Sequence, residues 1–211
     1  MFVIATISME LCAMNPTIKL LTGEELRSFL PFVAQQRINT FREFPYLYEG
    51  TIEYETDYLQ TYQENEHAAI AVAYVDNKIA GFATGVALNT FDKAMAEAMK
   101  QAGLDPTRFY YIGEVIVTPS FRGNKIAEAL FAALEQYGQS RGYAAGCFMT
   151  VVRADDDPQM PDNYRSLDRL WNRVGYKKSK ITVNYEWPTI QANGSIKEKN
   201  NQLILWLKDF K

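Results

Sequence analysis

The residues at one strand-to-helix corner are of types that bind an anion. The segment "FRGNKIAEAL", residues 121–130, follows the apolar run "YYIGEVIVTPS", and a helical pattern begins at once. A helix that begins directly after a strand points unpaired N–H groups and the positive end of its dipole into the corner, which suits phosphate. Gly123 allows close approach of the backbone, while Arg122 and Lys125 add two full charges that favour a pyrophosphate. The segment alone is also compatible with a solvated turn that carries two surface cations, which is the commoner case.

A second chemical candidate is Glu114, the one carboxylate inside the apolar strand pattern of residues 109–118. A buried carboxylate is disfavoured as an anion, so burial would raise the pKa of Glu114 toward values useful for a general base. The alternative is a glutamate that is satisfied by a neighbouring strand or that faces solvent.

The remaining composition excludes several other kinds of site. The chain has one histidine, His67, which excludes most zinc sites and any histidine-dependent triad that His67 does not itself supply. Two cysteines, Cys12 and Cys147, cannot form a disulfide scaffold and indicate a reducing compartment. No GxxxxGK[ST] or GxGxxG phosphate loop is present. A net charge of -3 and a pI of about 5.3 lack the basic bias of nucleic-acid binders.

The periodicities predict one mixed α/β domain over residues 17–211, preceded by an extension or extra strand at residues 1–16. The N-terminal segment is too short to span a bilayer and has no basic region typical of a signal peptide, so we expect a cytoplasmic protein without membrane contact. Thr22 with Glu25 predicts a capping box for the first helix, and Pro31 predicts a kink or break in it. The other predicted elements are a helix after Gly50, strands at 68–75, 78–88, 109–118, 144–152, 180–187 and 201–210, and helices at 92–103, 126–141 and 166–176.

The segment "EVIVTPSFRGNKIAEALFAALEQYGQSRGY" resembles motif A of the GCN5-related N-acetyltransferases (GNAT), and "RLWNRVGYKK" is similar to the family's last helix and its Gly-aromatic end. The predicted order of elements matches this family over nearly the whole chain. The segments "FPYLYEG" and "YETDYLQTY" further resemble a poorly characterised subgroup. The sequence departs from the family at Lys125, where the motif prefers glycine, and at Trp171, where the family often carries a tyrosine that acts as the general acid.

The resemblance implies an acetyl-CoA-dependent N-acetyltransferase with a splayed pair of central parallel strands and no metal. It implies that Glu114 is the general base, that Asn163 bonds to the CoA arm and that Trp171 packs beside the thioester. For the general acid we predict Tyr164, near the start of the last helix. Ordinary packing is the alternative for Tyr164 and Trp171. The remaining cofactor contacts would be Ile116 and Val117 with the pantetheine, and Arg122, Gly123, Asn124, Lys125, Ile126 and Ala127 with the pyrophosphate.

The acceptor is predicted to be a primary amine of a small molecule or a protein. Acids and aromatics in two segments would suit a cationic amine, although a solvated acidic face above packed tyrosines is the alternative. A non-catalytic CoA-binding module and an interaction domain without a cofactor are the competing functions, and the last strands allow a homodimer. The acceptor-side residues are Glu43, Tyr46, Tyr48, Glu49, Glu53, Tyr54, Asp57, Asp155, Asp156 and Asp157.

Overall fold

The computed structural model describes residues 15–211, which form a single domain around a seven-stranded sheet. The strands lie in the order β1-β2-β3-β4-β5-β7-β6, and only the β4–β5 pair is parallel. The predicted mixed α/β sheet is confirmed, whereas the extension predicted at residues 1–16 lies, up to residue 14, outside the described residues. The strands are β1 (Thr17–Leu21), β2 (Ala69–Val75), β3 (Lys78–Ala87), β4 (Phe109–Val117), β5 (Ala145–Val151), β6 (Lys177–Ile190) and β7 (Ile196–Asp209).

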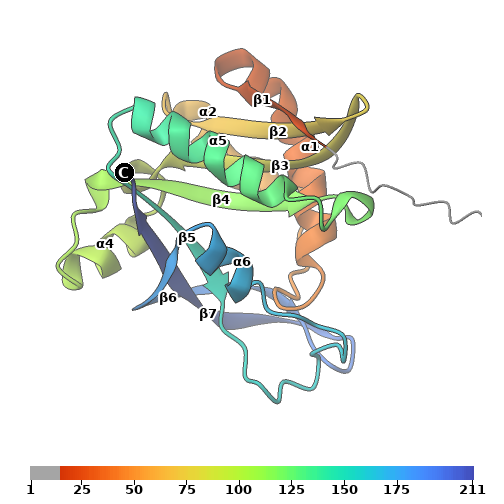
Figure 1. Ribbon diagram of the computed structural model, residues 1–211. Coiled ribbons are helices and arrows are strands. Elements are labelled where there is room, and N and C mark those ends of the chain that lie inside the picture. Colours follow the sequence, from red (N-terminus) through yellow and green to blue (C-terminus); the bar gives the residue numbers. More distant parts are fainter. Residues whose placement is uncertain (1–14) are drawn as a thin grey trace, which may run out of the picture.

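Helices cover both faces of the sheet (Figure 1). On one face α1 (Gly23–Phe41), α2 (Ile52–Glu64), α3 (Leu88–Phe91) and α4 (Lys93–Gln101) share a core that includes Leu30, Leu59 and Met95. On the other face α5 (Ile126–Ser140) and α6 (Asp168–Arg173) pack through a second core that includes Leu130 and Trp171. Two short 3₁₀ turns, Pro106–Arg108 and Pro119–Phe121, lie at the two ends of β4. None of the helices in residues 15–211 has the length and apolarity needed to cross a bilayer.

The parallel strands β4 and β5 pair only where they begin. Their register runs over Phe109↔Ala145, Tyr110↔Gly146 and Tyr111↔Cys147 and then stops. Each strand continues against its other neighbour, β4 with β3 as far as Val117 and β5 with β7 as far as Val151. The two strands therefore diverge and open a gap in backbone pairing at the centre of the sheet, which is visible in Figure 1.

A bulge in β4 decides which way Glu114 points. Between the pairs Ala83↔Val115 and Gly85↔Ile112, β4 contains one more residue than β3. Ile112 and Val115 consequently both belong to the core under α5, and the extra residue turns Glu114 to the face covered by α1 and α2. A side chain at residue 113 would force its surroundings to shift, because its Cβ would lie inside contact distance of the Tyr62 hydroxyl oxygen.

The capping box and the break at Pro31, two features predicted for the first helix, are absent from helix α1. Helix α1 continues past Pro31 without a break, as far as Phe41. Pro31 is exposed, so the carbonyl that loses its helical partner can bond to water. The helix does begin after Thr22, but the Thr22 side chain makes no capping hydrogen bond. Glu25 instead accepts a hydrogen bond from Lys19 of β1 at 2.7 Å.

The C-terminal elements also differ from the predicted bounds. Helix α6 covers Asp168–Arg173 and not residues 166–176, because Ser166 forms a local turn with Asp168. The β6–β7 hairpin is longer than predicted and remains paired as far as Ile190↔Ile196. Residues 197–200 at the start of β7 are polar and exposed, so periodicity alone indicated a loop there. Strand β5 pairs in parallel with β4 over Ala145–Cys147 and with antiparallel β7 over its whole length.

Candidate active site

The corner between β4 and α5 presents a set of backbone N–H groups. The first backbone hydrogen bond of α5 runs from Ala129 N–H to the carbonyl of Lys125, at 3.1 Å, so the N–H groups of the first turn have no partner within the helix. Gly123 has φ +84° and no atom within 4 Å of the place where a Cβ would stand. The backbone of this corner is thus accessible to a ligand and carries the positive end of the helix dipole.

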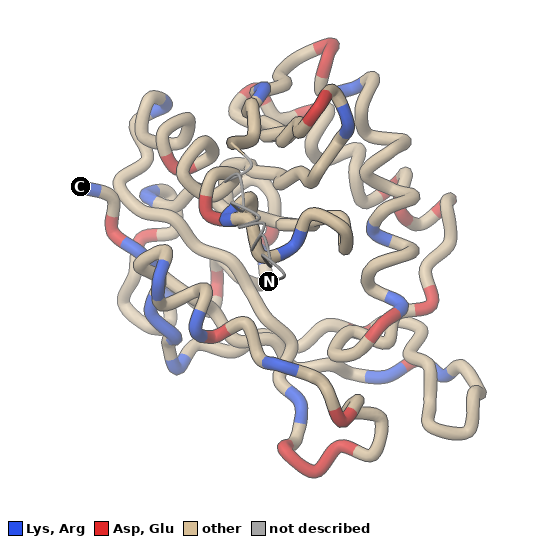
Figure 2. Tube along the Cα trace, turned by 45° about the vertical axis from the view of Figure 1, so that its right-hand side comes forward, with Lys and Arg blue, Asp and Glu red and all other residues tan. Residues whose placement is uncertain are grey.

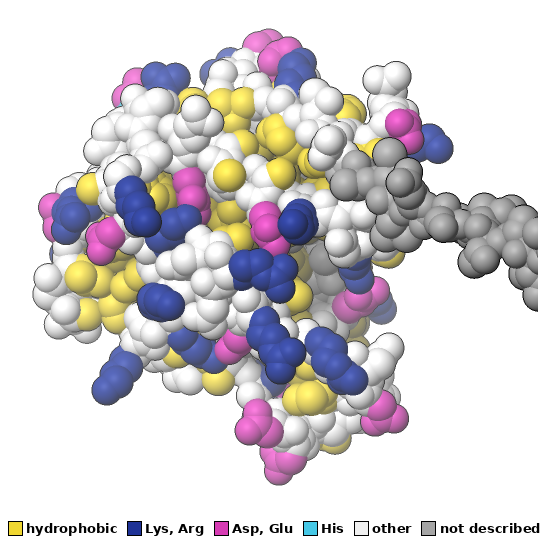
Figure 3. All heavy atoms as spheres, viewed as in Figure 1, with side chains coloured by type: hydrophobic (Ala, Val, Ile, Leu, Met, Phe, Trp, Pro, Cys, Tyr) yellow, Lys and Arg dark blue, Asp and Glu magenta, His cyan; other side chains and the backbone are white. Residues whose placement is uncertain are grey.

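Lys125 has the left-handed backbone conformation, with φ 58° and ψ 17°. That conformation favours glycine, which gives a structural reason for the preference of motif A at this position. The side chains of Arg122 and Lys125 are exposed, and Arg122 Nε donates to the carbonyl of Val117 at 3.3 Å. The side-chain amide of Asn124 is used locally, since it donates to the carbonyl of Phe121 at 3.1 Å. Figure 3 shows Lys and Arg side chains gathered over α6 and the first turn of α5.

The gap between β4 and β5 begins beyond Tyr111 and Cys147 and extends to this corner at the end of β4. Ile116 is buried on the α1–α2 side and Val117 is half-buried on the α5 side. Beyond Tyr111 the edge of β4 that faces β5 has no paired strand. A thin, extended ligand can therefore use backbone groups of β4 while its anionic end lies on the corner.

On the other face of the gap, Glu114 lies in a buried polar network. Residue Glu114 as a whole is 2% exposed. Its Oε1 accepts hydrogen bonds from Arg37 Nη1 and, at 3.3 Å, from the Tyr58 hydroxyl. Its Oε2 accepts from the Thr84 hydroxyl. Because one guanidinium and two hydroxyls donate to it, the carboxylate is stabilised as an anion and held in one orientation.

The same network contains a second buried carboxylate, Glu55, whose Oε2 accepts a hydrogen bond from Arg37 Nε. Sequence patterns predicted no role for Arg37 or Glu55. A signal was present, however, because Arg37 follows Leu30, Val33 and Ala34 on the buried face of α1. Glu55 likewise shares the buried face of α2 with Leu59 and Tyr62. A charged residue on an otherwise apolar helix face indicates a buried partner.

The predicted acid Tyr164 lies in the loop before α6 and not on the helix. Its ring packs edge-on against Phe44, with centroids 4.8 Å apart. Burial and the charge of Asp168 raise the pKa of Tyr164, so the phenol keeps its proton at neutral pH. Asn163, beside it, is exposed.

Trp171 and Cys147 are packing residues in this structure. Trp171 is 8% exposed, and its ring contacts those of Phe131 and Phe148 at centroid distances of 5.6 and 5.0 Å. Its place in the core under α5 leaves the position of the family's tyrosine without a proton donor. Burial raises the pKa of the Cys147 thiol, which therefore does not serve as a nucleophile at neutral pH.

The predicted acceptor-side residues divide into two groups. Tyr46 and Tyr48 face the Arg37 network: burial raises the pKa of Tyr46 to about 12, and the charge of Arg37 opposes that rise. The Tyr48 hydroxyl is buried near Glu55, and the pKa of Tyr48 is raised by burial and by that carboxylate. The predicted acidic residues do not lie beside these two tyrosines, and Figure 2 shows a run of acidic residues on a projecting loop. Exposed to solvent are Glu43, Glu53, Asp57, Asp155 and Asp156, while Glu49 pairs with Arg42.

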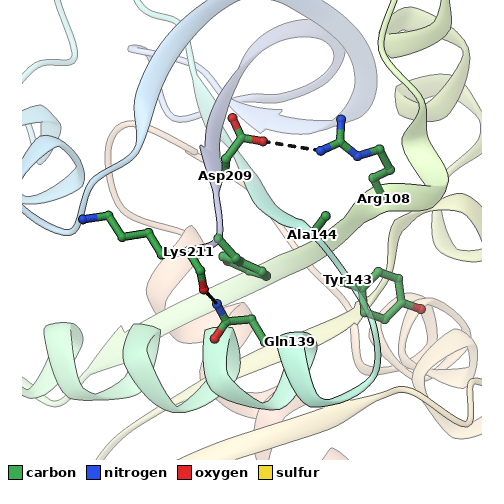
Figure 4. A pocket seen from close by; sticks show the side chains of 7 residues that line it. Arg108, Gln139, Tyr143, Ala144, Asp209 and Lys211 are labelled. Carbon is green, nitrogen blue, oxygen red and sulfur yellow. Dashed lines mark hydrogen bonds and ion pairs between the residues drawn. The ribbon is translucent and has the colours of Figure 1, made fainter.

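A hollow at the opposite end of the β4–β5 pair is separate from these groups (Figure 4). Arg108 and Asp209 pair across it at 3.8 Å, and Gln139 donates to the carbonyl of Lys211 at 3.1 Å. The Tyr143 hydroxyl at its edge is 2.7 Å from His67 Nδ1. None of the residues that line this hollow belongs to the corner or to the Glu114 network. Among the described residues, no group of three or more His, Cys, Asp or Glu side chains could hold a metal ion.

The sequence over residues 36–161, more than half of the chain, matches the profile of the acetyltransferase (GNAT) family. No curated protein matches the chain in sequence.

Solved structures share the fold at low sequence identity. An N-acetyltransferase from Staphylococcus aureus Mu50 superposes with a TM-score of 0.56 at 20% identity, covering 93% of this chain and 99% of the other. A ribosomal-protein-alanine N-acetyltransferase from Brucella melitensis gives 0.54 at 15% identity, with 92% and 99% covered. The Salmonella typhimurium protein yncA, described with its cofactor acetyl-CoA, gives 0.55 at 11% identity, with 93% and 95% covered. These likenesses concern the fold alone.

Proposed function

We propose that this chain, which belongs to the acetyltransferase (GNAT) family, transfers an acetyl group from acetyl-CoA to a primary amine. The observation that carries the proposal is the opening between β4 and β5, which has an anion-binding helix corner at its end and a buried, oriented carboxylate on its far side. The described structure of yncA with acetyl-CoA supports the choice of cosubstrate. A small-molecule amine and a protein amine both fit, and the Brucella melitensis relative acts on a protein by its name.

The residues of the corner fit a diphosphate. The free N–H groups at the start of α5 and the open space around Gly123 allow the backbone to contact the phosphates. Arg122 and Lys125 add positive charge beside that backbone. Ile116 and Val117 on the open edge of β4 would pair with the pantetheine arm, whose amide groups can bond to a strand. Asn163, in the loop after β5, and Trp171, on α6, would contact the same arm.

Acetyl transfer requires that the amine first lose a proton, because a lysine-type amine has a pKa of about 10. Glu114 takes this proton, directly or through a water molecule, and such general-base catalysis contributes roughly 10²–10⁴-fold in rate. The amine nitrogen then bonds to the thioester carbonyl carbon, and a backbone N–H of β4 stabilises the oxyanion. The C–S bond breaks, the nitrogen loses its second proton to solvent, and Tyr164 donates its own proton to the departing thiolate and is reprotonated from solvent. The products are the N-acetylated amine and CoA.

A non-catalytic CoA-binding module on the same fold is the alternative, and the position of Trp171 favours it to a small degree. Thermal unfolding in the presence of CoA, acetyl-CoA and ATP tests the binding step. Both CoA species should raise the Tm and ATP should do so much less. A folded protein whose Tm does not respond to CoA would refute the proposal. A cytoplasmic location and a homodimer stay predictions from the sequence.

A further inference from the structure

One guanidinium, that of Arg37, lies between two buried carboxylates. Arg37 Nε donates to Glu55 and Nη1 donates to Glu114. The side chains of the three residues are 11%, 0% and 1% exposed. The guanidinium carbon also lies 4.1 Å from the centre of the Tyr58 ring and 5.0 Å from that of Phe41. Arg37 thus joins α1, α2 and β4 at the candidate general base.

This cluster is a costly arrangement if its only effect is on stability. Two carboxylates share one cation, so the three groups carry one negative charge in excess. Buried ion pairs often stabilise a protein less than apolar residues of similar volume. Both helices supply apolar residues at the adjacent positions of the same faces. A strongly coupled charged cluster beside an opening in the sheet is more typical of a functional site.

We propose that Arg37 is a positioning residue for acetyl transfer and that Glu55 anchors it. This inference rests on the proposed function, because it assigns how Glu114 is held while it accepts the amine proton. Arg37 holds Oε1 of Glu114 while Thr84 holds Oε2, so the carboxylate cannot rotate. Glu55 fixes the other end of the guanidinium fork, which stops Arg37 from turning away.

The charged groups around Glu114 determine the direction in which each substitution should shift the pH at which Glu114 gains a proton. Burial raises the pKa of both Tyr58 and Tyr62, so the phenols stay neutral at working pH. Arg37 and Glu55 are therefore the charged groups of this cluster that can shift the pH at which Glu114 gains a proton. The groups that face the cluster are Arg37 on α1, Tyr46 and Tyr48 in the following loop, Glu55, Tyr58 and Tyr62 on α2, and Thr84 on β3.

The experiment measures kcat/KM for amine acetylation as a function of pH, together with CoA affinity by calorimetry, for four variants. Arg37→Gln removes the cation, Arg37→Lys keeps a charge without the fork, and Glu55→Gln removes the second anion. The control is Arg27→Gln on the exposed side of the same helix, where Arg27 pairs with Glu24 at 3.2 Å.

The acid-side fall of kcat/KM should move to higher pH in Arg37→Gln and to lower pH in Glu55→Gln, each by about one unit. In Arg37→Lys it should stay in place while kcat falls about tenfold, because a point charge cannot bridge both carboxylates. CoA affinity should not change in any variant. If Arg37→Gln does not fold, Arg37→Lys and Glu55→Gln still give the two diagnostic readouts.

The outcomes separate the two proposals. An active wild type whose Arg37→Lys and Glu55→Gln variants match the Arg27→Gln control in kcat and in pH profile overturns the positioning role alone. A wild type that binds CoA but acetylates no amine overturns the proposed function and the positioning role with it. Opposite shifts of the acid-side fall in Arg37→Gln and Glu55→Gln support the positioning role, since a merely structural contact would not produce them.

Discussion

Lys125 combines two effects at the corner, the strain of its left-handed backbone and the positive charge of its side chain. Different substitutions of this residue separate the two. Its φ of 58° places a side chain in the left-handed region, at the first position before α5. We predict that Lys125→Gly stabilises the protein but weakens CoA binding. Lys125→Gln, which keeps the strained backbone and removes only the charge, should weaken CoA binding without the gain in stability.

The magnitudes follow from two separate terms. A left-handed conformation costs a residue with a Cβ roughly 1–2 kcal/mol. Glycine loses more conformational freedom on folding, which offsets about 0.5–1 kcal/mol of the strain that the substitution relieves. The net gain for Lys125→Gly is about 0.5–1 kcal/mol, or about 1–4 °C in Tm for a chain of this size. An exposed charge beside a diphosphate contributes about 0.5–1 kcal/mol, which is roughly two- to fivefold in Kd.

The assays are thermal unfolding without ligand and calorimetric titration with CoA at low and at high salt. The loss of affinity should be the same in both variants at low salt and should shrink at high salt, because the charge is exposed and screened. Lys125→Arg, which keeps both strain and charge, is the control and should match the wild type in Tm and in Kd.

Either half of the reasoning can be refuted by itself. A lower Tm for Lys125→Gly, or an equal gain for Lys125→Gln, contradicts the left-handed backbone at this residue. An unchanged CoA affinity at low salt in both variants shows that the Lys125 ammonium does not face the diphosphate.

Further substitutions test the base, the corner, the bulge and the buried phenols. Glu114→Gln should lower turnover roughly 10²–10⁴-fold with CoA affinity unchanged; equal turnover in a thiol-release assay excludes the base role. Arg122→Ala should weaken CoA binding about three- to tenfold at low salt, and an unaltered Kd in calorimetry argues against the corner. Gly113→Ala should lower the urea midpoint by the equivalent of about 1–3 kcal/mol, since its Cβ would crowd Tyr62 Oη and stand 2.8 Å from Thr84 Oγ1; an unchanged midpoint contradicts the bulge. Burial raises the pKa of Tyr62 to about 12, so its contribution to stability is complete below about pH 10 and is lost between there and pH 12. Tyr62→Phe should flatten that part of the denaturation profile, and a decline as steep as in the wild type contradicts this.

Local patterns were sufficient to predict the corner and the order of the elements. Arg122, Gly123 and the helix after them follow one another in the sequence, and the end of one strand and the start of one helix determine their chemistry. The apolar run around Glu114 likewise indicated a strand. Both features are determined by residues that are adjacent in the sequence, so local patterns are sufficient to predict them.

The polar network could not be predicted in the same way. Arg37 and Glu114 are 77 residues apart, and Arg37 and Glu55 are 18 apart. Their contact depends on the bulge in β4 and on how α1 crosses the sheet, neither of which has a periodic signal. The strands predicted for the β6–β7 hairpin were too short for a similar reason, because exposed polar residues in a paired strand have the same pattern as a loop.

The central claim is tested most directly by incubating the protein with acetyl-CoA and a panel of primary amines, from small diamines to lysine- and alanine-terminated peptides. Thiol release and the mass of the amine product are then followed together. The account predicts release of CoA matched by a one-to-one gain of an acetyl group on at least one amine, and loss of both in Glu114→Gln. A protein that binds acetyl-CoA yet leaves every amine in the panel unmodified would contradict it.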